Sequence, residues 1–136
     1  MKTTEIIFIK VADNRTKVWH LCDRIKTHFQ MGERILITVS GHEAASYIDD
    51  LLWRYPEDSL LPHRIINTPS NERVAITLAR DNLNNATVLF NLLPEAYPQF
   101  EQFVTVYEFY DETHPSKAEL SKQRLTAYPS HTFFCF

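Results

Sequence analysis

The sequence predicts an α/β fold: a three-layer sandwich with a mostly parallel sheet. Strand-like and helical patterns alternate in the first half of the chain, and more strands follow, with a helix before the last of them. Residues 34–40 are apolar almost throughout, which is typical of a strand buried on both faces. Only Gly32 and Gly41 are glycines, so no glycine-rich phosphate loop can form. We therefore expect a doubly wound, Rossmann-like sandwich without a phosphate-binding loop.

The first strand and the first helix are predicted by side-chain type and spacing. Residues 5–11 are rich in β-branched and aromatic side chains, which favours a strand. Apolar residues at steps of three and four predict a helix over 15–31. Asp13 and Asn14 are both able to cap its start, and Gly32 is well placed to end it.

A second helix follows the strand at 34–40, and a proline-containing connection follows that helix. Ser40 and Glu43 form a capping-box pattern ahead of the apolar stripe at 44–52. Pro56 and Pro62 prevent one continuous helix across residues 51–66. Large apolar side chains on a stiff surface connection indicate a docking site more than a catalytic one. These side chains are Trp53, Tyr55 and Leu60.

The second half contains more strand patterns. We expect strands at 64–66, 74–78 and 87–92, a short helix that carries Phe100, Phe103 and Val104, and a last strand at 104–110.

A final helix and an apolar tail complete the chain. Ser116 and Glu119 form a second capping-box pattern, and Pro129 ends the helix near Tyr128. The tail, 131–136, is apolar enough to dock on the core or to complete a sheet edge.

Composition limits the function classes. The 136 residues predict one domain, 1–136, with a net charge of −3 and a pI near 6.0. This charge leaves no general basic field, so we expect no direct specific nucleic-acid binding. Cys22 and Cys135 match no metal-ligand spacing and fit a cytoplasmic protein with reduced thiols. No apolar run is long enough to cross a membrane, and we expect no membrane partner.

Residues able to do chemistry are present, but they form no recognisable motif. HExxH, CxxC and paired-carboxylate patterns are missing, so we expect no catalysis, no cofactor and no metal. The alternative is a small hydrolase or phosphoryl-transfer enzyme with Asp13, His42 or Asp81 at the ends of the strands. His63 is interpreted either as a histidine bonded to local backbone or as a partner contact.

The final helix has an unusual polar face. At 100° per residue, Lys117, Ser121, Arg124 and Tyr128 share one narrow face, and Lys122 lies to one side. This face has two interpretations. It is either a binding site for an anionic peptide end or a solvated basic face near a helix C-terminus.

Two segments of the sequence resemble a known family. WRYPEDSLLPH, Trp53–His63, is similar to the W-x-x-P-x-x-S-F-x-P-H segment of the chi subunit of bacterial DNA polymerase III. KQRLTAY, Lys122–Tyr128, is similar to the family's R-x-R-Y-K-A-Y. Leu60 stands where an aromatic residue is usual, and Leu125 and Thr126 replace a Tyr-Lys pair.

The resemblance implies a non-catalytic accessory protein of the clamp-loader complex. Its partners would be the psi subunit, or alternatively a helicase-like protein, and the acidic, Phe-terminated tail of single-stranded DNA-binding protein. The resemblance places Trp53, Leu60, Pro62 and His63 on the psi or helicase side. The predicted tail-binding residues are Lys122, Arg124 and Tyr128, with Lys117 on the same face as Arg124.

Overall fold

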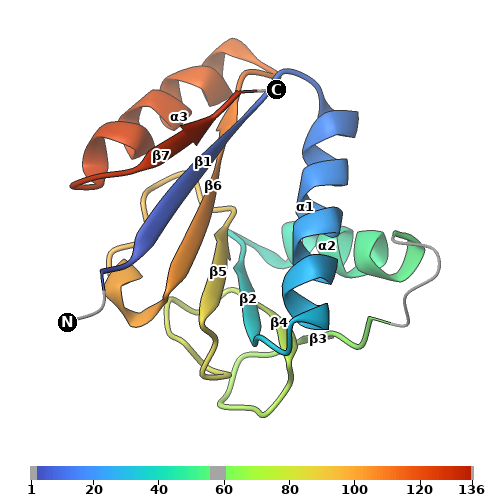
Figure 1. Cartoon of the computed structure of the whole chain (residues 1–136). Helices are drawn as coiled ribbons and strands as arrows, with labels where there is room; N and C mark the ends of the chain where they lie inside the picture. The colour runs from blue at the N-terminus through green and yellow to red at the C-terminus, as the bar shows by residue number, and fades with distance from the viewer. Residues whose placement is uncertain (1–2, 56–60, 136) are drawn as a thin grey trace.

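A computed structural model describes residues 3–55 and 61–135 of the chain (Figure 1). In these residues the strands form a seven-stranded sheet in the order β3-β4-β2-β5-β6-β1-β7, and every pair is parallel. The strands are β1 (Glu5–Val11), β2 (Ile35–Thr38), β3 (Arg64–Ile65), β4 (Val74–Thr77), β5 (Val88–Asn91), β6 (Thr105–Asp111) and β7 (Thr132–Phe134). The helices are α1 (Asn14–Gln30), α2 (His42–Arg54) and α3 (Pro115–Ala127), with a 3-10 turn, η1, at Phe100–Gln102. The predicted α/β sandwich is confirmed.

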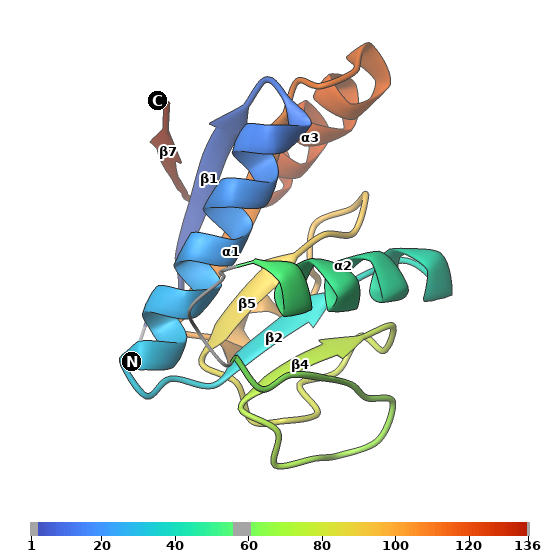
Figure 2. The ribbon, with the colours of Figure 1, turned by 90° about the vertical axis from the view of Figure 1, so that its right-hand side faces the viewer.

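The helices form the two outer layers of the sandwich. Helices α1 and α2 cover one face of the sheet, and α3 covers the other (Figures 1 and 2). Strand side chains alternate between these layers. In β1, Ile7 and Ile9 pack in the core under α1 and α2, whereas Ile6 and Phe8 pack in the core under α3.

The first helix has the ends that the sequence predicts. The Asp13 carboxylate accepts a hydrogen bond from the Thr16 N–H at 2.7 Å, which satisfies one free donor of α1. Gly32 has a φ of +82°, a left-handed conformation that costs glycine little.

Both predicted capping boxes are wrong. Helix α2 begins at His42, so its N-cap is Gly41, and Ser40 lies one residue too early to cap it. Helix α3 begins at Pro115, because the fixed φ of proline suits the first helical position. Its N-cap is His114, whose Nδ1 accepts from the Ser116 N–H at 3.2 Å.

The tail adds a strand that follows the one predicted to be last. β7 pairs with β1 at one edge of the sheet, with Ile7 opposite Thr132 and Ile9 opposite Phe134. The expectation that the tail completes an edge is thus confirmed, and the expectation that the strand near 104–110 is the last is wrong. The predicted short helix is the single turn η1. Among the described residues, no helix is long and apolar enough to span a membrane.

Candidate functional site

The C-terminal end of α2 presents a tryptophan on a firm support. The Trp53 side chain is 64% exposed, and its ring lies against His63 with 4.3 Å between ring centroids. The His63 ring is buried, with Nδ1 2.9 Å from the Leu61 carbonyl oxygen and Nε2 3.1 Å from the Asp49 carbonyl oxygen. His63 is therefore bonded to local backbone, and its ring joins Leu61 to Asp49 on α2.

Of the four residues predicted on this side, the structure brings Trp53 and His63 together. Pro62 is exposed next to His63. Leu60 lies outside the described residues. A contact of these residues with a partner stays a prediction.

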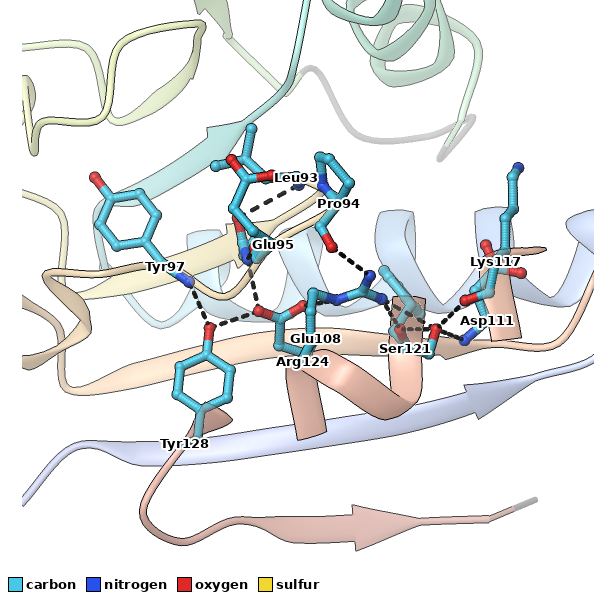
Figure 3. A network of polar contacts seen from close by, with 12 residues as sticks. Leu93, Pro94, Glu95, Tyr97, Glu108, Asp111, Lys117, Ser121, Arg124 and Tyr128 are labelled. Carbon is cyan, nitrogen blue, oxygen red and sulfur yellow. Dashed lines mark hydrogen bonds and ion pairs between the residues drawn. The ribbon is translucent and has the colours of Figure 1, made fainter. Parts of the chain in front are cut away.

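On the opposite face of the sheet, the polar face of α3 is turned inward (Figure 3). Ser121, Arg124 and Tyr128 are buried, at 0%, 8% and 5% exposure. The Arg124 Nε donates to the Glu108 Oε1 at 3.0 Å, and its Nη2 donates to the Phe109 carbonyl at 2.7 Å. The solvated interpretation of this face is thus wrong for these three residues. Lys117 and Lys122 are exposed.

Glu108, on β6, is the centre of this arrangement. It is 0% exposed, and its Oε2 accepts from the Asn91 Nδ2 and from the Tyr128 hydroxyl, both at 2.6 Å. The Tyr128 oxygen in turn accepts from the Tyr97 N–H at 2.9 Å. We call Glu108, Arg124, Tyr128 and Asn91 the Glu108 network. Because every oxygen of the carboxylate has a donor, α3 is held against β6 by satisfied polar contacts.

Burial also changes the acidity of this network. Loss of hydration raises the pKa of Glu108 to about 7, although Arg124 and the hydrogen bonds from Asn91 and Tyr128 act in the opposite direction. Burial and the nearby Glu108 charge raise the pKa of Tyr128. A carboxyl group that titrates near neutral pH therefore lies under α3.

Sequence reasoning missed Glu108. Its signal is an acidic residue inside the apolar strand VYEFY, on the same side of the strand as the buried Val106. A buried acid requires a donor or a cation nearby. The polar face of α3 was the matching signal, 16 residues further along the chain.

A cavity of about 270 Å³ lies between the ends of β5 and β6 and one side of α3. Lys117 and Arg124 both line it, together with Leu120 and an ion pair between Lys17 and Asp111 at 2.7 Å. Burial raises the pKa of Asp111, but hydrogen bonds from Lys17 and Thr113 outweigh burial and lower it to about 2. Of the predicted tail-binding residues, Lys117 and Arg124 thus meet at one cavity, whereas Lys122 and Tyr128 do not line it.

The residues considered for catalysis do not form a site. Asp13, His42 and Asp81 are exposed, and none lines this cavity or the larger groove between α1 and α2. Within residues 3–55 and 61–135, no three His, Cys, Asp or Glu side chains are grouped to hold a metal ion. Cys22 is buried, and burial raises the pKa of its thiol to about 11.

The fold and its polar contacts define a class: a Rossmann-like α/β domain with a buried Glu–Arg pair under its third helix and an exposed tryptophan at the end of its second. The family model of the DNA polymerase III chi subunit, HolC, matches residues 3–133. The chain therefore belongs to the chi subunit family of DNA polymerase III, as the resemblance predicts, and it is an accessory protein of DNA replication. A comparison with curated protein sequences finds no significant match.

Proposed function

We propose that this protein is a non-catalytic adaptor of the replicase. One surface binds the clamp-loader side, through the psi subunit or a helicase-like protein. A second surface binds the acidic C-terminal tail of single-stranded DNA-binding protein. The observation that carries this proposal is the match to the chi subunit family over residues 3–133.

The first surface, which we call the α2-end surface, consists of the exposed residues Trp53 and Pro62, with the buried His63 ring beneath the indole. Tryptophan is enriched among the residues that dominate binding energy in protein interfaces. The His63 ring supports the indole, and His63 itself is fixed by contacts to Leu61 and Asp49. Because the support exists before a partner binds, little side-chain entropy is lost on binding.

The second surface, which we call the α3 surface, consists of Lys117, Leu120 and Lys122. Both lysines are exposed, and Leu120, whose side chain is 37% exposed, lines the same cavity as Lys117, whereas Lys122 lies on another side of α3. A terminal carboxylate near Lys117 gains charge-assisted hydrogen bonds, while Leu120 offers apolar contact to a terminal phenyl ring. Buried as they are, Arg124 and Tyr128 support this surface by holding α3 in place.

The two surfaces belong to helices on opposite faces of the sheet (Figures 1 and 2). Partners on α2 and on α3 therefore do not compete for one site. Single-stranded DNA coated with its binding protein presents many tails, so a weak grip on each tail is strengthened by high local concentration. Tethering in this way requires no bond to be made or broken.

Fluorescence anisotropy with a labelled acidic peptide that ends in Phe tests the tail-binding part. The Lys117→Ala/Lys122→Ala variant should bind roughly tenfold more weakly, because two charge-assisted contacts are lost. The affinity of the unmodified chain should also fall as salt rises. Arg64→Ala is the matched control, because its exposed cation lies at the far edge of the sheet. Equal affinity of the double variant and the unmodified chain would remove the α3 surface from the proposal.

A further inference from the structure

We infer that the groove between α1 and α2 is a separate docking site, which binds an acidic segment of a partner protein with a bulky apolar residue. The groove has a volume of about 930 Å³. It includes no residue of the α2-end surface or the α3 surface. The inference therefore goes beyond the proposed function and does not depend on it.

The groove follows from how the two helices pack. Helices α1 and α2 lie on the same face of the sheet with their axes at an angle to one another (Figure 2). The Asn14 side-chain amide reaches the Tyr47 hydroxyl at 3.4 Å. The buried side chains of Cys22 and Leu51, each 4% exposed, also line the groove and form its apolar floor.

Aromatic side chains form the rim of the groove. Trp19 is 61% exposed, Tyr47 is 47% exposed and Tyr55 is 48% exposed, and all three line the same groove. Tyrosine and tryptophan offer large contact area with few rotatable bonds, and they pair an apolar ring with a polar atom. An apolar side chain that enters the groove would be surrounded by these rings above an apolar floor.

The charge of the groove is opposite in sign to that of the whole chain. Its lining carries the cations Arg15, Lys26 and Arg54 and the single anion Asp23, a sum of +2, whereas the chain carries −3. Arg54 is already paired with Asp50 at 2.7 Å, so Arg15 and Lys26 are the cations that a partner would meet, and with Asp23 they leave the lining a charge of +1. Neither of these two forms an ion pair within residues 3–55 and 61–135.

The position of Arg15 supports a binding role. It lies in the first turn of α1, where a cation opposes the helix dipole and does not stabilise the helix. The Asp13 carboxylate at the N-cap already interacts electrostatically with Arg15, and an acidic side chain bound nearby would add a second favourable charge.

The charge pattern favours a peptide over a nucleic acid. A single strand of nucleic acid is bound along a continuous row of cations that follows its phosphates. Here Asp23 lies within the lining, and the rest of the chain is acidic overall. An acidic peptide with one bulky apolar residue can place its carboxylates at the two cations and its apolar side chain among the aromatic rings. The regularly spaced phosphates of a nucleic acid do not match this arrangement.

A displayed library of random 16-residue peptides, selected on the full-length chain, tests the inference. The selected peptides should carry an excess of Asp and Glu with at least one Leu, Phe or Trp. Binding of the synthesised peptides should weaken at least tenfold in Trp19→Ala and in the Arg15→Glu/Lys26→Glu variant. Trp53→Ala is the matched control, since it removes an equally exposed tryptophan outside the groove and should leave binding unchanged. Circular dichroism of each variant confirms that it is folded.

Several outcomes would overturn the inference. The first is that the selected peptides show no acidic excess. The second is that the groove variants leave the binding of acidic peptides unchanged. The third is that the chain binds a labelled dT20 oligonucleotide and the groove variants abolish this binding. The Lys117→Ala/Lys122→Ala variant keeps this test distinct from the proposed function. It should leave the selected peptides bound while it weakens the Phe-terminated tail peptide.

Discussion

The two faces of the sheet hold their helices in different ways. On one face, α1 buries His20, Leu21, Cys22 and Ile25, and α2 buries Ala45, Ile48, Leu51 and Leu52. On the other face, the buried residues of α3 are Ser121 and Arg124. Apolar packing thus attaches the first two helices, whereas α3 combines the apolar contacts of Leu125 and the Tyr128 ring with the Glu108 network.

This difference has consequences for binding. Apolar contacts have no preferred direction, so α1 and α2 can lie at an angle and leave a groove between them. Hydrogen bonds have narrow geometry, so the Glu108 network fixes the rotation of α3 and with it the direction of Lys117 and Lys122. A single substitution in the Glu108 network should therefore change the free energy of unfolding most.

Arg124→Ala should have the largest effect on stability. It leaves the Glu108 carboxylate buried without its cation, which typically costs about 3–5 kcal/mol in free energy of unfolding. Urea denaturation followed by circular dichroism measures this change. The double variant Glu108→Leu/Arg124→Leu should recover much of the loss, because no charge is then left buried. A loss below about 1 kcal/mol in Arg124→Ala would contradict the importance of the pair.

Leu52→Ala tests the apolar face in the same assay. Leu52 is 2% exposed on α2, and truncation of a buried leucine costs about 2–5 kcal/mol through lost burial and the cavity left behind. This loss should be the same at pH 5 and at pH 8, because no titrating group is involved. A loss that changes with pH would mean that the two faces are coupled.

A fall in stability with rising pH should come from the α3 face, because the buried His20 on α1, whose pKa is lowered by burial, contributes a change of the opposite sign. Burial raises the pKa of Glu108 from its ordinary value of 4.5 to about 7, so between these pH values the folded protein keeps a proton that the unfolded chain releases. The free energy of unfolding should therefore fall as pH rises from 4.5 to 7, by up to about 3 kcal/mol. Glu108→Gln should remove this slope. If the free energy of unfolding of Glu108→Gln still falls with pH by the same amount, the pH dependence comes from other groups.

Trp53→Ala should have the smallest effect on stability and a large effect on binding. The side chain is mostly exposed, so we expect a change in unfolding free energy below about 1 kcal/mol. Co-precipitation with the psi subunit or the helicase-like partner should nevertheless be lost, because an anchor residue is removed. Retained binding by this variant would exclude the α2-end surface as the contact.

The sequence predicts the strands better than it predicts the orientation of the helices. Continuous apolar runs such as 34–40 indicate buried parallel strands, and Asp13 and Gly32 mark the ends of α1 correctly. A capping box is recognised from only two residues, so the pattern does not fix where a helix begins. Ser40 and Ser116 were therefore wrongly assigned as N-caps, and the N-caps are Gly41 and His114.

The candidate site was predicted only in part for a related reason. Spacing places Arg124 and Tyr128 on one face of a helix but does not say whether that face meets solvent or a buried acid. Glu108, the residue that decides this, lies on another element. The Trp53–His63 segment is local, and its aromatic and proline residues were recognisable without the fold.

Simultaneous binding of two partners tests the central claim most directly. Analytical ultracentrifugation of the full-length chain with the psi subunit (or the helicase-like partner) and the labelled, Phe-terminated tail peptide should show a ternary complex. Trp53→Ala should lose only the protein partner, and Lys117→Ala/Lys122→Ala should lose only the peptide. Displacement of one ligand by the other would contradict the account, because it would mean that a single surface serves both.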